Sequence, residues 1–134
     1  MKRALFLLAA VALCPAAASA DSLSVTDMAF GTGIESRAVI GVDTTFTIDQ
    51  GRVYCWTVVT GAGADDSVYH TWYKGDLMVQ KVALGVRGAR WRTHSYKTLG
   101  EGLAGAWRVE VTDRGDRMLA EATITIADPP TETP

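Results

Sequence analysis

The sequence is short of the residues that would stabilise a small domain covalently. Its 134 residues include only two cysteines, Cys14 and Cys55, and asparagine is absent. Because Cys14 lies in the N-terminal segment described next, the remainder has a single thiol and cannot form an intrachain disulfide. Its fold must therefore depend on an apolar core. Within the run VYCWTVV, Cys55 is predicted to be a buried, unreactive thiol; an intermolecular disulfide or a reactive cysteine is the alternative.

Long apolar segments are missing beyond the first twenty residues. Those twenty begin with Lys2 and Arg3, continue with an apolar run and end in Ala-Ser-Ala, the pattern of a signal peptide cleaved after Ala20. A lipoprotein signal at Cys14 is the alternative, but Leu13 stands where a small residue is needed. No later segment has the ~18–20 apolar residues of a transmembrane helix. We expect an exported protein, periplasmic or secreted, with one domain over 21–127 and a disordered tail over 128–134.

Basic charge is also scarce. Without Lys2 and Arg3, 11 basic residues stand against 15 acidic ones, which changes the net charge from −2 to −4. This balance argues against non-specific binding of nucleic acid, which needs a basic surface. Two histidines and one cysteine show no zinc spacing, and GAGADD (61–66) lacks the alternating ligands of a calcium loop. We expect no nucleic-acid partner, no metal ion and no cofactor; the sequence does not define an oligomeric state.

Short extended segments fill the remainder of the chain. They are rich in β-branched and aromatic residues, turn residues separate them about every ten positions, and no segment has a convincing helical period. Short connections favour antiparallel neighbours. The pattern predicts an all-β, immunoglobulin-like antiparallel β-sandwich of about seven to eight strands without a disulfide. The strands are expected at 23–30, 38–48, 52–60, 67–74, 77–86, 90–99, 106–113 and 117–127, with 31–37 as a loop.

Side-chain alternation gives the segment 90–99 two different faces. The core face is predicted to carry Trp91, Thr93, Ser95, Lys97 and Leu99. The opposite face carries the candidate ligand-binding residues: Arg90, Arg92 and His94 as an anion-binding ridge, and Tyr96 as a stacking surface. The alternative is a solvated face that acidic neighbours such as Glu110 balance through cross-strand ion pairs.

A family resemblance is carried by three spaced segments, HTW (70–72), RWRTHSYK (90–97) and AWRVEV (106–111), which RVYCWTVV (52–59) precedes. With these motifs, the chain resembles a bacterial envelope family, the domain of unknown function 2914, over nearly all of the segment after residue 20. The resemblance implies a compact β-rich module and supplies no reaction. The residues that match the family motifs are His70, Trp72, Trp91, Arg92, Thr93, Ser95, Lys97, Gly105, Trp107 and Val109.

Two motif positions also raise the question of catalysis. A hydrolase or transferase could use His70 with Ser95 or Lys97, because a base beside a hydroxyl or an amine is the arrangement of a nucleophilic site. Coordinates with the His70 ring out of reach of both would exclude it. We favour instead a polar network that ties strands together, with Lys97 paired to a carboxylate, and assign no catalytic residue. The leading hypothesis is a non-catalytic interaction module that binds a protein segment or an acidic envelope polymer; a purely structural domain is a further alternative.

Overall fold

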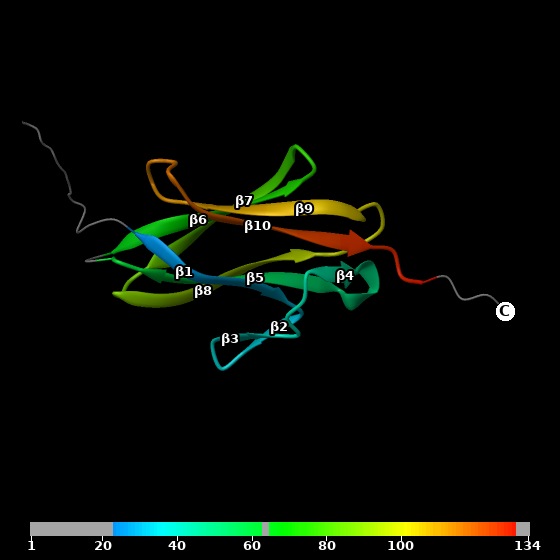
Figure 1. Cartoon of the computed structure of the whole chain (residues 1–134), viewed down its shortest axis with the longest axis horizontal. Helices are drawn as coiled ribbons and strands as arrows, with labels where there is room; N and C mark the ends of the chain where they lie inside the picture. Colours follow the sequence, from blue (N-terminus) through cyan, green and yellow to red (C-terminus); the bar gives the residue numbers. More distant parts are fainter. Residues whose placement is uncertain (1–22, 63–64, 131–134) are drawn as a thin grey trace, which may run out of the picture.

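The computed structural model describes residues 23–62 and 65–130 (Figure 1). The predicted signal peptide and residues 131–134 of the predicted tail lie outside this part of the chain. Residues 128–130 are exposed and have no regular secondary structure. The part of the chain that the structure describes has no helix long and apolar enough to cross a membrane.

Seven long strands form the body of the domain, each within one residue of a predicted segment. They are β1 (Ser24–Gly31), β5 (Arg52–Thr60), β6 (Asp66–Lys74), β7 (Leu77–Val86), β8 (Arg90–Thr98), β9 (Gly105–Thr112) and β10 (Met118–Ala127). Between β1 and β5 lie three strands of three residues each and one short 3-10 helix. These are β2 (Gly33–Glu35), β3 (Ala38–Ile40), β4 (Thr45–Thr47) and η2 (Ile48–Gln50).

The strands pack as two layers, with a separate hairpin on the outside (Figure 1). One sheet has the order β1-β5-β8 and the other has the order β4-β10-β9-β6-β7. All neighbours are antiparallel except β4 and β10, which run parallel. In this arrangement β1, β5 and β8 take the places of strands A, B and E of an immunoglobulin domain, and β6, β7, β9 and β10 take those of C, C′, F and G. The predicted immunoglobulin-like sandwich is confirmed.

The segment between β1 and β5 corrects two predictions. Residues 31–37, expected to be a loop, contribute β2 to a hairpin with β3, and the expected strand 38–48 is two strands separated at Gly41, whose φ is +66°. The hairpin turn is Ser36-Arg37, with φ of 51° and 67°. Such two-residue turns normally carry Asn or Gly, which tolerate positive φ, so this one gave no turn signal in the sequence.

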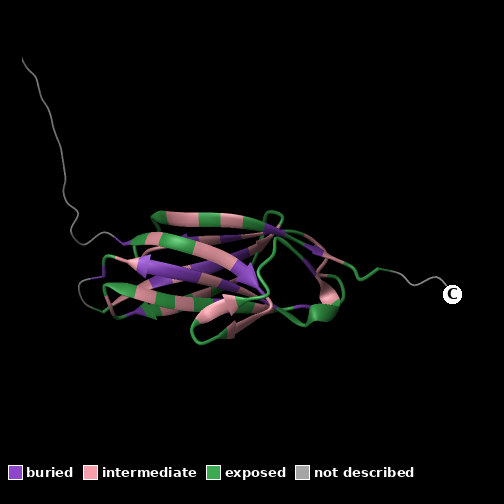
Figure 2. Ribbon diagram, turned by 60° about the horizontal axis from the view of Figure 1, so that its bottom comes forward, coloured by how far each residue is buried: buried purple, intermediate pink, exposed green. Residues whose placement is uncertain are grey.

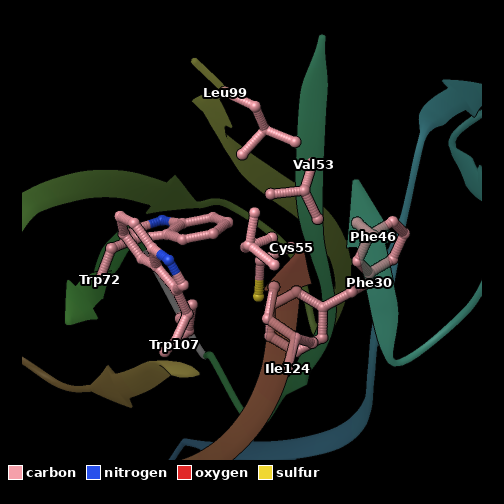
Figure 3. Close-up of a cluster of buried hydrophobic side chains, with 10 residues drawn as sticks. Phe30, Phe46, Val53, Cys55, Trp72, Leu99, Trp107 and Ile124 are labelled. Atoms are coloured by element: carbon pink, nitrogen blue, oxygen red, sulfur yellow. The ribbon is translucent and has the colours of Figure 1, made fainter. Parts of the chain in front are cut away.

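The core lies between the two sheets, and burial alternates along the strands that enclose it (Figure 2). Trp72 on β6 and Trp107 on β9 are 0% and 2% exposed, and they gather around Cys55 of β5 (Figure 3). Antibody domains place a disulfide between strands B and F at this depth, beside a tryptophan on strand C. Here the strand F position contributes the Trp107 indole, so packing replaces the covalent link. Cys55 is a free, buried thiol as predicted, and burial raises its pKa.

Candidate ligand-binding face

The candidate residues of β8 lie on the outer face of the three-stranded sheet, as alternation predicts. Arg90, Arg92, His94 and Tyr96 are exposed, whereas Ser95 and Leu99 on the inner face are buried. Their neighbours on β5 follow from the antiparallel register. The pairs across the two strands are Arg90 with Thr60, Arg92 with Val58, His94 with Trp56 and Tyr96 with Tyr54. Cationic and aromatic side chains therefore share one face.

A groove of ≈ 570 Å³ occupies the part of this face between the β2–β3 hairpin and β8. Arg90, Arg92 and His94 line it from β8, Trp56 from β5 and Arg37 from the hairpin turn. The Trp56 indole Nε1–H donates a hydrogen bond of 2.9 Å to the backbone oxygen of Arg37, which fastens the turn to the sheet. The hairpin thus brings a further arginine to three of the four predicted residues.

The fourth predicted residue, Tyr96, lies outside this groove, further along β8. The Arg52 guanidinium is 4.5 Å from the centre of its ring, and the Tyr54 ring centre is 5.6 Å away. Tyr96 instead lines a smaller hollow of ≈ 370 Å³, where the Gln80 side chain of β7 donates a 2.9 Å hydrogen bond to the Tyr96 backbone oxygen. The predicted ridge therefore divides into the groove and an aromatic extension.

The two sheets differ in how their arginines are neutralised. On the five-stranded sheet and in its β9–β10 turn, all three arginines have a carboxylate within 4 Å: Arg108 with Glu110 (3.0 Å), Arg114 with Asp66 (3.6 Å) and Arg117 with Asp113 (3.2 Å). The other five arginines of the described chain have no such ion pair among the described residues. These are Arg37, Arg52, Arg87, Arg90 and Arg92.

This contrast removes the ion pairs on which the solvated-face interpretation of the ridge depends. Glu110, proposed as its balancing carboxylate, lies on β9 of the opposite sheet and bonds Arg108. No acidic residue is among the described residues that line the groove, so its lining is cationic. Fixed, unneutralised guanidinium groups in a concave surface attract anions and bind carboxylate or phosphate with paired hydrogen bonds.

A second polar cluster is enclosed between the sheets. His70 Nδ1 lies 2.6 Å from Ser95 Oγ, and His70 Nε2 lies 3.1 Å from Thr57 Oγ1. Trp72 Nε1–H donates to Ser95 Oγ at 3.0 Å. Both ring nitrogens therefore have hydroxyl partners, which a neutral imidazole satisfies as one donor and one acceptor. Burial lowers the pKa of His70 from 6.5 to about 3, and the charge of His94 acts in the same direction.

The cluster brings together two of the three residues considered for catalysis. Ser95 is within hydrogen-bond reach of His70, so the distance between the two side chains does not exclude a catalytic pair. Lys97 forms no hydrogen bond with His70 or Ser95, and the expectation that it pairs with a carboxylate is wrong within the residues described. No group of three or more histidine, cysteine, aspartate or glutamate side chains in 23–62 and 65–130 could hold a metal ion.

The fold and the face together define a small β-sandwich module with a cationic groove on one outer surface. Residues 65–126 match the model of the family described as "Protein of unknown function (DUF2914)", which supports the predicted family resemblance over these residues. The motif residues His70, Trp72, Ser95 and Trp107 all fall inside the match. No curated protein matches the chain.

The match is narrower than the predicted resemblance, which extended over nearly all of the segment after residue 20. It covers β6 to β10 and leaves out β1 to β5, which precede it in the chain. Half of the ten family-motif residues are buried: His70, Trp72, Ser95, Trp107 and Val109. Arg37 and Trp56, by contrast, lie outside the match and were missed in the sequence. The sequence signal that could have indicated Trp56 is alternation, which places Tyr54 and Trp56 on one face of β5.

Proposed function

We propose that the protein is an exported, non-catalytic binding module of the cell envelope, which captures an anionic partner on the outer face of the three-stranded sheet. The partner is a protein segment or an acidic envelope polymer. The observation that carries the proposal is the group of arginines around a ≈ 570 Å³ groove that have no carboxylate partner within 23–62 and 65–130, on a chain whose net charge is negative. Export is supported by the signal-peptide pattern of the first twenty residues.

The size and lining of the groove are those of a binding site. Its volume falls within the range of about 300–1,000 Å³ typical of ligand pockets. Arginine and tryptophan are enriched at binding hot spots, because each combines a large contact area with directional hydrogen bonding. Ion pairs at such a surface would neutralise it, and the structure places the ion pairs of the arginines on the opposite sheet.

We predict that the triple variant Arg90→Gln/Arg92→Gln/His94→Gln loses retention on immobilised dextran sulfate, a polyanion that requires only charge complementarity. Because the three side chains are exposed, its melting temperature should stay within about 2 °C of the parent. The matched control is Lys81→Gln/Arg114→Gln, which removes the same formal charge from the opposite sheet and should be retained like the parent. Equal retention of the triple variant and the parent would remove this face from consideration.

A hydrolase or transferase that uses His70 and Ser95 is the alternative, and their 2.6 Å contact is the observation in its favour. Three features favour the structural role instead. His70 is 0% and Ser95 4% exposed, the Ser95 oxygen already accepts the Trp72 indole N–H, and the second ring nitrogen of His70 is occupied by Thr57. A histidine that acts as a general base needs a free ring nitrogen, or an acceptor on its second nitrogen that orients the ring. Here that acceptor would be a threonine hydroxyl, which supplies no negative charge to stabilise an imidazolium.

A further inference from the structure

We infer that the groove binds a saccharide unit of a linear polyanionic glycan, a polyuronate-like polymer with a carboxylate on each ring. The inference rests on the proposed function of this face and names the chemical class of its ligand. In this arrangement, the Trp56 indole provides apolar contact for a sugar ring. Arg37, Arg90 and Arg92 hold successive carboxylates. Both sets of side chains line the same hollow.

The lining favours a flat, hydroxylated and charged ligand. The Trp56 indole, three guanidinium groups and the His94 imidazole are among the lining groups, and Ile34 is the sole aliphatic residue among the described lining residues. Indole rings offer apolar faces to the C–H groups of a sugar, while Arg grips carboxylate bidentately. Arg90 and Arg92 are two residues apart on one strand face, about 6.8 Å along β8. Two regularly spaced cations along a strand suit a polymer with regularly repeated carboxylates.

The same features disfavour an acidic peptide. Peptides that dock on sheets add a strand to a free edge and place alternate side chains in apolar pockets. β8 is an edge strand of its sheet, and at Tyr96 its backbone oxygen already accepts a hydrogen bond from Gln80 of β7. The groove lies on the face of the sheet. A lining with one aliphatic residue offers no series of apolar pockets.

Arg37 is held at the groove by an unfavourable backbone conformation. Its φ of 67° and that of Ser36 (51°) lie in the left-handed region, where glycine would be at ease and arginine is strained. The Trp56 indole holds this turn by bonding the Arg37 carbonyl. Strained backbone of this kind concentrates at ligand-binding sites, where the side chain it presents is needed. Arg37 is therefore assigned as a ligand contact.

The test is isothermal titration calorimetry of the chain from residue 21 with three probes of similar length: an oligogalacturonide, the same oligomer with its carboxylates reduced to alcohols, and hexaglutamate. We expect binding of the oligogalacturonide, at least about tenfold weaker binding of hexaglutamate and none of the reduced oligomer. Trp56→Ala and Arg37→Gly should each weaken binding of the oligogalacturonide by about tenfold.

The Arg37→Gly variant separates binding from folding. Glycine relieves the positive φ at position 37, so the melting temperature should be unchanged or raised while binding falls. Asp116→Gly is the matched control, because Asp116 has a φ of 65° in a turn next to the opposite sheet; it should have the same effect on stability and none on binding. If hexaglutamate binds as well as the oligogalacturonide, or if Arg37→Gly binds like the parent, the glycan inference is wrong while the anion-binding face stands. If the parent protein is also not retained on dextran sulfate, the proposed function is wrong as well.

Discussion

Replacing Trp72 by alanine is expected to lower the free energy of unfolding by about 3–5 kcal/mol, the range for a fully buried aromatic residue. Trp72 is 0% exposed, and its ring packs edge-on against Phe30 of the opposite sheet with the ring centres 6.1 Å apart. It also donates its indole N–H to Ser95. Since the domain has no disulfide, and small domains are stable by only about 5–15 kcal/mol, this single change should remove a large part of the total.

A comparison with Trp56 gives the measurement its control. Trp56→Ala removes the same side chain from the outer face of β5, where it is half-buried, and should cost about 1 kcal/mol. Urea unfolding followed by far-ultraviolet circular dichroism measures both variants. Trp72→Phe should lie between the parent and Trp72→Ala, because it keeps most of the packing and loses the hydrogen bond. Similar losses for Trp72→Ala and Trp56→Ala would contradict the assignment of inner and outer faces.

Acid should destabilise the domain through His70 well before its carboxylates protonate. The imidazole pKa is about 3 in the folded state and about 6.5 in the unfolded chain, so only the unfolded chain takes up a proton between these values. The contribution of neutral His70 to stability is complete above pH 6.5 and declines as the pH falls towards 3. Linkage gives a slope that approaches about 1.4 kcal/mol per pH unit, or a loss of about 2–3 kcal/mol between pH 7.5 and 4.5.

The His70→Gln variant isolates this effect. It should be less stable than the parent at pH 7.5, because an amide cannot reproduce both imidazole contacts, and its stability should change little down to pH 4.5. Asp113, whose pKa is lowered mainly by the backbone N–H of Arg117, loses its contribution only below the ordinary aspartate value of 3.8 and so acts outside this window. His94→Gln, on the exposed outer face, should keep the slope of the parent. A parent whose stability is flat from pH 7.5 to 4.5 would contradict the buried, neutral state of His70.

Much of the fold follows from local pattern. The seven long strands were predicted because alternation, β-branched content and glycine turns all agree within each segment, as in RWRTHSYKT of β8 and its turn at 87–89. The pairing of β4 with β10 is non-local, and three residues carry too little periodicity to show it. The hairpin was missed for a different reason: Ser36 and Arg37 adopt positive φ without the residues that normally permit it.

The candidate site shows the same division between local and non-local information. Arg90, Arg92 and His94 share a face by alternation on one strand, which is local. Their lack of carboxylate partners is not local, because it depends on Glu110 belonging to the opposite sheet. The place of Arg37 depends on a hairpin that folds back over β5. Likewise, alternation predicts that Ser95 faces the core, but only the packing of the two sheets shows that His70 and Trp72 satisfy its hydroxyl and that Thr57 satisfies the second nitrogen of His70.

The central claim is that the outer face of the three-stranded sheet binds anions while the buried polar cluster supports the fold. The most direct measurement is a titration of the ¹⁵N-labelled protein with a sulfated dextran oligomer, following the four tryptophan indole N–H resonances. The Trp56 indole lines the groove, Trp91 packs against the core from the inner face of β8, and Trp72 and Trp107 are buried in the core. We expect the Trp56 resonance to shift and saturate while those of Trp72 and Trp107 stay in place. Shifts confined to Trp72 and Trp107, or no shift at any of the four, would contradict the claim.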